Sequence, residues 1–144
     1  NAYQRQGTDT AEVLENINRY TTLGGCFEVC LRPAVSALTI GYHAGLIEYA
    51  YNKKLLIKSL LVTEPGFLDA SILPADVKLQ YLQTFVPLIH KLSGADNLDY
   101  NATNPNEIKR NLAQHIETCV TLLSGPRPVD ADQKLQDMVD HCRR

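Results

Sequence analysis

Several features that would assign a function class at once are missing from this sequence. No apolar run approaches the ~20 residues that a membrane-spanning helix needs, and no secretory signal peptide opens the chain. The 14 Lys and Arg residues stand against 16 Asp and Glu residues, for a formal net charge of −2. Nucleic acids and anionic membranes attract an excess of basic charge, which this chain lacks. We therefore expect neither of them as a partner.

The short motifs that mark common catalytic centres are also absent. The chain has no G-x-G-x-x-G loop and no Walker motif, so no phosphate-binding loop is predicted. It has no G-x-S-x-G sequence, which excludes the serine nucleophile of that motif. We therefore do not expect a complete catalytic site on this chain, and no catalytic residue can be named.

Four cysteines are present, at Cys26, Cys30, Cys119 and Cys142. An even number could form disulfides in a secreted protein, but a 144-residue chain without a leader is more typical of reduced thiols. We therefore expect a cytoplasmic location. Cys26 and Cys30 lie four residues apart in a predicted strand, roughly 13 Å by the strand rise. That distance is too long for one bridge or one metal ion, so structural thiols are favoured over an iron–sulfur site.

The spacing of the histidines along the sequence does not predict a metal site. Apart from the adjacent His141 and Cys142, no histidine is paired with another histidine or cysteine at zinc-ligand spacing. His90, His115 and His141 fall on predicted helices, where partial exposure is expected. His43 follows a predicted strand, at the end of a sheet where α/β proteins bind ligands. It is a candidate for substrate binding, with an ordinary loop histidine as the alternative.

The first half of the chain alternates between helical and extended patterns. Asp9 can cap a helix that ends at Gly24-Gly25, and a second helix is predicted over 41–53. Strands are predicted over 26–32, closed by Pro33, and over 57–63. This alternation is typical of βα units around a parallel sheet, so the fold class is predicted to be α/β. Two strands cannot form a stable open parallel sheet, and further strands are expected before Asn1.

The second half is predicted to be helical. The apolar spacing indicates a helix over 75–92, which Pro87 should kink, and two more over 104–124 and 130–142. The chain therefore divides into βα units over 1–74 and a helical extension over 75–144.

Charged residues at the predicted strand ends are further candidates for a site. Arg32 ends the first strand, and a guanidinium is suited to binding a carboxylate. An ion pair with Glu28 is an equal alternative. Glu64 begins the Glu64-Pro65-Gly66 sequence after the second strand, where it is a candidate for substrate binding, with a simple turn as the alternative.

Four stretches, taken in order, resemble a known family. They are 3–9 leading into a helix, 27–40, 46–50, and 59–68 followed by Ile72-Leu73-Pro74. This order is similar to that of the C-terminal part of twitch-type radical S-adenosylmethionine (radical SAM) proteins. The helices that follow and the Gly125-Pro126-Arg127-Pro128 sequence also fit, so the resemblance covers nearly the whole chain.

The resemblance implies the C-terminal portion of a partial (βα)6 barrel, with parallel strands followed by a helical segment. In that family a [4Fe–4S] cluster cleaves S-adenosylmethionine to a 5′-deoxyadenosyl radical. The C-x-x-x-C-x-x-C and Gly-Gly-Glu sequences of the family are absent here. The implied function is thus the C-terminal fragment of an enzyme for a peptide or a small natural-product precursor. It would be inactive without a missing N-terminal half or a second subunit. The alternative is a non-catalytic binding or scaffold module.

The resemblance also places three residues beside the S-adenosylmethionine pocket by their position. These cofactor-binding candidates are Arg32, Ser36 and Thr63. His43 and Glu64 remain the substrate-binding candidates, and no metal-binding residue is predicted.

Overall fold

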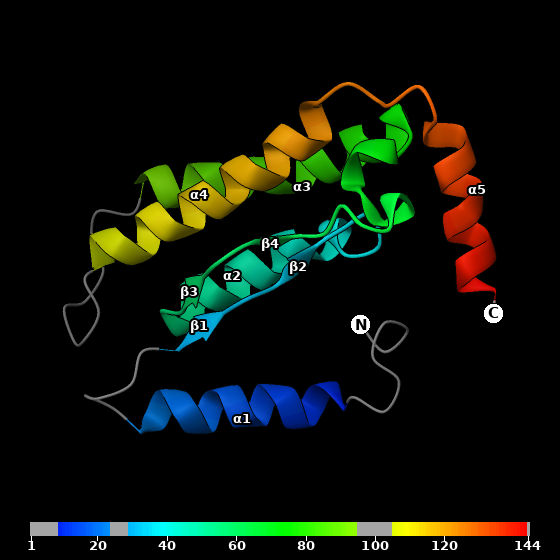
Figure 1. The fold of residues 1–144 in the computed structure, drawn as a ribbon. Helices are drawn as coiled ribbons and strands as arrows, with labels where there is room; N and C mark the ends of the chain where they lie inside the picture. Colours follow the sequence, from blue (N-terminus) through cyan, green and yellow to red (C-terminus); the bar gives the residue numbers. More distant parts are fainter. Residues whose placement is uncertain (1–8, 24–28, 95–104, 144) are drawn as a thin grey trace.

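The computed structural model describes residues 9–23, 29–94 and 105–143 (Figure 1). About 70% of this part of the chain is helical. The helices are α1 (Thr10–Thr22), α2 (His43–Lys53), α3 (Ala75–Gly94), α4 (Pro105–Ser124) and α5 (Ala131–Cys142). The strands are β1 (Cys30–Leu31), β2 (Ala34–Val35), β3 (Leu56–Ile57) and β4 (Leu60–Leu61), and three 3-10 turns cover Ile40–Tyr42, Gly66–Leu68 and Ala70–Ile72.

The four short strands form two parallel pairs, β1 with β3 and β2 with β4. The register is the same in both pairs, with Cys30 opposite Leu56 and Ala34 opposite Leu60. Backbone hydrogen bonds continue through and beyond the pairs, because the N–H groups of residues 56, 58, 60 and 62 donate to the carbonyls of residues 29, 31, 33 and 35. The pairs therefore belong to one parallel ladder of residues 29–35 and 56–62.

Pro33 explains why this ladder is divided into two pairs. Its carbonyl accepts a hydrogen bond from the Leu60 N–H at 3.0 Å. Proline has no N–H to return toward the partner strand, so one bond of the regular pattern is missing at this position. The prediction that Pro33 ends the first strand was therefore wrong, since the pairing resumes at Ala34 and Val35.

Helix α2 connects the two sides of the ladder, which makes a single βαβ unit. Its buried residues Ile47 and Ala50 face the core. The helix ends at Lys53, the capping residue Lys54 has a left-handed φ of 57°, and the Leu55 N–H then donates to the Ala50 carbonyl at 2.9 Å. This turn reverses the chain into β3, so the predicted helix-then-strand order over 41–63 is confirmed.

The prediction of the C-terminal portion of a partial (βα)6 barrel was nevertheless wrong. The described chain is mainly helical and its β structure is limited to the two short parallel pairs. The predicted α/β class was wrong with it, although the alternating pattern did indicate the one βαβ unit that is present. A side chain of α4 also takes the place of a further strand at one position of the ladder. The Asn111 side-chain oxygen accepts a hydrogen bond from the Ile57 N–H at 2.5 Å.

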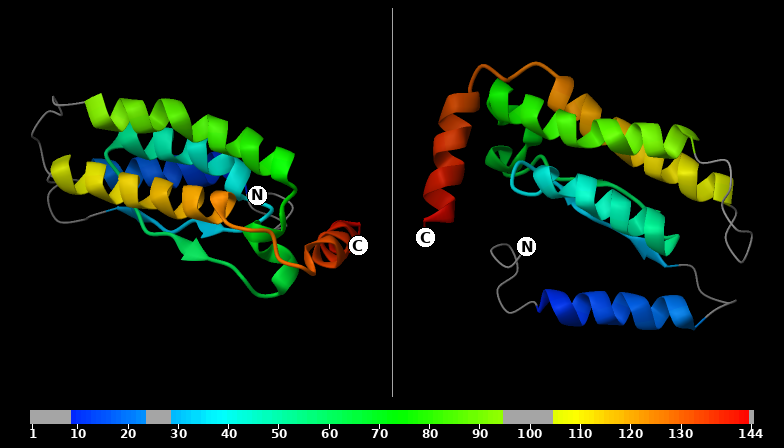
Figure 2. Two further views of the ribbon diagram at one scale, coloured as in Figure 1. Left: turned by 90° about the horizontal axis from the view of Figure 1, so that it is seen from above. Right: turned by 180° about the vertical axis from the view of Figure 1, so that it is seen from behind.

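Helices α3 and α4 pack side by side and cover α2, as both views in Figure 2 show, and α4 also contacts β3. Phe85 of α3 and Leu112 of α4 are fully buried in this layer. The three helices predicted for the second half are confirmed, and Pro87 does lie inside α3. The Asp130 carboxylate does not cap α5 but pairs with Lys134 at 2.9 Å.

Helix α1 lies on the other side of the ladder from α3 and α4 (Figure 1). The predicted cap is confirmed, because the Asp9 carboxylate accepts from the Ala11 N–H at 2.8 Å. None of the helix's residues is buried, although Ile17 packs against the core. Within the described ranges, no helix combines the length and the apolar character of a membrane span.

Candidate functional site

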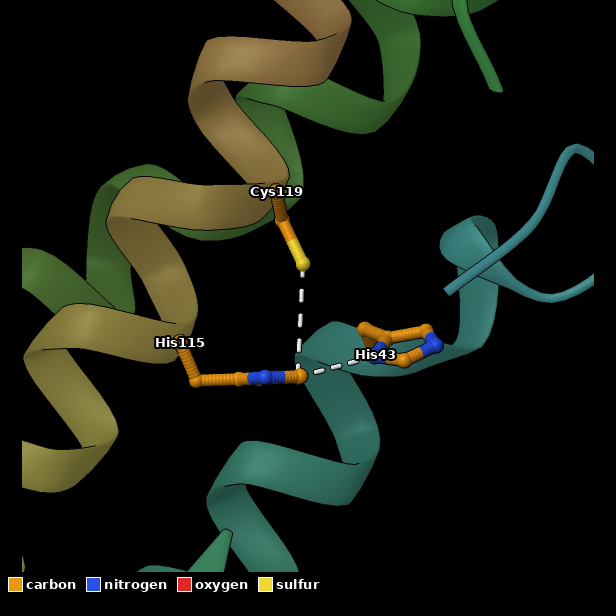
Figure 3. A group of neighbouring side chains, drawn as sticks. All are labelled: His43, His115 and Cys119. Atoms are coloured by element: carbon orange, nitrogen blue, oxygen red, sulfur yellow. Dashed lines mark hydrogen bonds between the residues drawn. The ribbon is translucent and has the colours of Figure 1, made fainter. Parts of the chain in front are cut away.

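A cluster of three buried side chains joins α2 to α4 (Figure 3). His43 is the first residue of α2, and His115 and Cys119 lie one turn apart on α4. Their exposed fractions are 2%, 1% and 0%. We call these residues the His–His–Cys cluster.

Direct hydrogen bonds connect the two rings and tie them to the ladder. His43 Nδ1 lies 2.9 Å from His115 Nε2, and the rings stack with their centroids 5.0 Å apart. His43 Nε2 lies 3.1 Å from the Ala34 carbonyl oxygen, and His115 Nδ1 lies 2.5 Å from the Ser59 hydroxyl. The Cys119 sulfur lies 4.0 Å from His115 Nε2. One continuous chain of contacts therefore runs from one strand of the ladder, through both helices, to the other strand.

The carbonyl at one end fixes every proton along this chain. Ala34 O can only accept, so His43 must carry its proton on Nε2. The neutral ring then accepts at Nδ1, so His115 must carry its proton on Nε2. His115 Nδ1 is left to accept from the Ser59 hydroxyl. Each ring is satisfied as a neutral imidazole, as buried polar groups require.

Burial also keeps the cluster uncharged near neutral pH. It lowers the pKa of His43, with the Ala34 carbonyl opposing the change. It lowers the pKa of His115 to about 4, and the proximity of His43 adds to the effect. Burial raises the pKa of the Cys119 thiol to about 12. Cys119 is therefore no thiolate nucleophile as it stands, but two neutral imidazoles and a thiol are potential metal ligands.

Ser36, a predicted cofactor-binding residue, is buried in a turn next to the cluster. Its N–H donates to Thr39 Oγ1 at 3.0 Å, and the two hydroxyls are also 3.0 Å apart. The Thr39 hydroxyl donates to the Ala34 carbonyl at 2.6 Å, the same oxygen that accepts from His43. The structure therefore gives Ser36 local partners in the turn before α2.

The other predicted site residues lie on the surface. Arg32, Thr63 and Glu64 are exposed, and none of them contributes to the cluster. Among the described residues, no carboxylate forms an ion pair with Arg32. Glu28, its suggested partner, and Cys26 both lie outside the described residues, so the ion pair and the Cys26–Cys30 interpretation stay predictions.

Of the predicted candidates, the structure places only His43 in the cluster. The prediction that His115 is partly exposed was wrong, as was the conclusion that no histidine pairs with a cysteine at ligand spacing. Cys119 is the fourth residue after His115, which places the two side chains about one helical turn apart on the same face. They fall on the apolar stripe of α4, whose other buried members are Ile108, Leu112, Ile116 and Leu123. The apolar stripe could have indicated from the sequence that His115 and Cys119 are buried side by side. The contact with His43 depends on the tertiary fold and could not have been predicted in this way.

A separate groove of about 320 Å³ lies between α3 and α4. Its lining residues are Ile89, Leu92, Ser93, Lys109, Arg110, Ala113 and Ile116. The groove contains no member of the His–His–Cys cluster, so the two features are distinct.

Comparison with known proteins does not assign this arrangement to a family. No protein-family model matches the chain, and neither a curated protein nor a solved structure shows significant similarity to it.

Proposed function

We propose that this chain is a non-catalytic section of a radical SAM protein, and that it binds the rest of that protein through the uncovered end of its β ladder. The observation that carries the proposal is the exposure of two consecutive strand residues. Leu60 is 58% exposed and Leu61 is 50% exposed. The radical SAM part of the proposal is supported by the order of the sequence segments alone.

The exposure is confined to one end of the strand. Leu56 and Ile57 are 5% and 2% exposed, so the beginning of the same strand is covered on both faces. Adjacent strand residues point to opposite faces, and Leu60 and Leu61 therefore leave both faces uncovered. Apolar side chains exposed on both faces of a strand end can be buried by another chain, so this end of the ladder is suited to binding a protein.

Backbone geometry at the same position favours added β structure. The Leu60 N–H is directed toward the Pro33 carbonyl. Backbone groups of neighbouring residues in a parallel strand point to opposite sides, so those of Leu61 face away from β2. A further strand can pair at this edge. At the other end of the strand, Asn111 already occupies the Ile57 N–H.

Helix α1 presents further apolar surface. Val13, Leu14 and Tyr20 have the spacing of one apolar helix face, and they are 43%, 40% and 60% exposed. A helix normally covers such a face against a neighbour. A partner that contacts both the ladder end and α1 would bury these side chains.

The positions of the titratable groups favour binding over catalysis. The His–His–Cys cluster is buried and neutral, so it presents no base or nucleophile to a substrate. Arg32, Thr63 and Glu64 are exposed, and no hydrogen bond joins Arg32 to either of the other two among the described contacts.

The test uses the complete reading frame that contains this chain. We expect it to encode a C-x-x-x-C-x-x-C segment, and the anaerobically purified protein to cleave S-adenosylmethionine to 5′-deoxyadenosine. The Leu60→Lys/Leu61→Lys variant should lose most of this activity. Its two new charges would lie in the contact with the part of the protein that binds the [4Fe–4S] cluster, which we call the cluster-bearing part.

The matched control is Val86→Lys, which changes an apolar residue that is 50% exposed on α3. This variant should retain the activity of the parent protein. A reading frame without the cysteine segment would contradict the radical SAM assignment. Equal activity of the leucine variant and the control would contradict the contact through Leu60 and Leu61.

A further inference from the structure

We propose that His43, His115 and Cys119 form a binding site for a late first-row transition metal ion, Zn²⁺ in the first place. One ligand atom from each side chain lies within 4.8 Å of the others. This site is independent of the proposed radical SAM function, because none of its residues belongs to the exposed ladder end.

The three ligand atoms are close to the spacing that a tetrahedral zinc site needs. With zinc–nitrogen and zinc–sulfur bonds of about 2.1 and 2.3 Å, ligand atoms are separated by about 3.4 to 3.6 Å. The two nitrogens here are 2.9 Å apart, and His115 Nε2 is 4.0 Å from the Cys119 sulfur. The first contact must open and the second must close by about half an ångström each, and His43 Nδ1 and the Cys119 sulfur, which lie within 4.8 Å of each other, must approach to about 3.6 Å.

The donor set selects the class of ion. Two imidazoles and one thiolate suit zinc and copper, whereas magnesium and calcium prefer oxygen ligands. Three protein ligands also leave one position of a tetrahedron for water or another small ligand.

Groups around the cluster already orient two of the ligands. The Ala34 carbonyl accepts from His43 Nε2 at 3.1 Å, so His43 Nδ1 carries the free electron pair. Ser59 lies 2.5 Å from His115 Nδ1. Such outer contacts are the usual support of a metal site. The contact of His43 already leaves Nδ1 free to bind, whereas the Ser59 hydroxyl can either donate to or accept from His115.

Metal binding requires a defined movement of protons. His115 must release Nε2 for the metal, so its proton moves to Nδ1 and is donated to the Ser59 oxygen, which reverses that hydrogen bond. Cys119 must lose its thiol proton to become a thiolate ligand. The histidine proton stays within the ring, so binding releases about one proton per metal ion, and that proton comes from Cys119.

The experiment is calorimetric titration of the purified, tag-free chain with Zn²⁺ in two buffers of different ionisation enthalpy. We expect one ion per chain and the release of about one proton. Titration with Co²⁺ should give the sulfur-to-cobalt charge-transfer absorption of a thiolate ligand. An ion bound without proton release or without this absorption would exclude Cys119 and overturn the proposal.

Three variants should differ in their affinity for Zn²⁺. Cys119→Ser should lose the charge-transfer band and most of the affinity, and Ser59→Ala, which removes an outer contact, should weaken binding by about tenfold. Cys142→Ser changes an exposed cysteine on α5 and should bind as the parent does.

Folding of each variant is checked by circular dichroism, and His43→Gln provides a second ligand variant if Cys119→Ser does not fold. The proposal is overturned if the folded parent chain binds no Zn²⁺. It is also overturned if Cys119→Ser or His43→Gln binds as tightly as the parent, since the cluster would then serve only as a hydrogen-bonded contact between α2 and α4.

Discussion

His115 shows how a buried polar residue can be compatible with a helical core. It is 1% exposed, yet both ring nitrogens have partners, at His43 and Ser59. A buried imidazole without partners would cost about 1 to 3 kcal/mol for each lost hydrogen bond. The chain from Ser59 to Ala34 avoids this cost only while both rings stay neutral, because each ring then has one donor and one acceptor.

This proton arrangement predicts that acid destabilises the fold. The pKa of His115 is about 4 in the folded chain, against 6.5 for an unperturbed histidine. The unfolded state therefore binds a proton more readily, and the free energy of unfolding should fall as the pH is lowered from about 6.5 toward 4. For His115 alone the loss is about 3 kcal/mol.

Urea unfolding in the absence of metal, at a series of pH values, measures this dependence. His115→Gln should flatten the decrease, whatever its own stability. His90→Gln, at an exposed position on α3, should leave it unchanged. A parent chain whose stability is the same at pH 7 and pH 4.5 would contradict the buried neutral pair.

Sequence reasoning identified His43 as a candidate but could not identify its partners. His115 is 72 residues away along the chain, and no local pattern encodes that contact. The His115–Cys119 spacing was readable, because both residues fall on the apolar stripe of α4. The prediction that His115 is partly exposed overlooked that Leu112 and Cys119, each about one turn away, lie on the apolar stripe.

The helices were more predictable than the strands. Local signals start and end a helix, and Asp9 and Pro105 do lie at the beginning of α1 and α4. Strand lengths depend on the partner strand. Pro33 removes a donor without ending the pairing, and Leu60 and Leu61 are apolar without being buried. The prediction of a strand over 57–63 was therefore only partly correct.

Pro87 gives a prediction at the scale of one helix. It lies inside α3, where it cannot donate the N–H of a regular helical turn, and its side chain is exposed. Pro87→Ala should restore this hydrogen bond without removing a core contact. We expect the free energy of unfolding to rise by about 1 to 3 kcal/mol.

Chemical unfolding of the variant and the parent at the same pH checks this value. Val86→Ala, at the neighbouring exposed position, is the control and should change stability by less than about 0.5 kcal/mol. A loss of stability in Pro87→Ala would show that α3 depends on the proline.

At the scale of the whole molecule, α3 and α4 pack on one side of a single βαβ unit, and α1 lies on its other side with none of its own residues buried (Figure 1). The alternating sequence pattern identified this unit correctly. Its extension to a barrel came from the resemblance, and the helical content of the described chain contradicts it. The uncovered ladder end at Leu60 and Leu61 is a feature of this one βαβ unit.

The most direct measurement is light scattering on the purified chain mixed with the separately produced iron–sulfur-binding part that the proposed function expects in the complete protein. The account predicts a one-to-one complex for the parent chain and for Val86→Lys, and no complex for Leu60→Lys/Leu61→Lys. If the parent chain and the cluster-bearing part stay separate at stoichiometric concentrations, the ladder end is not a binding surface for that part and the proposed function is contradicted.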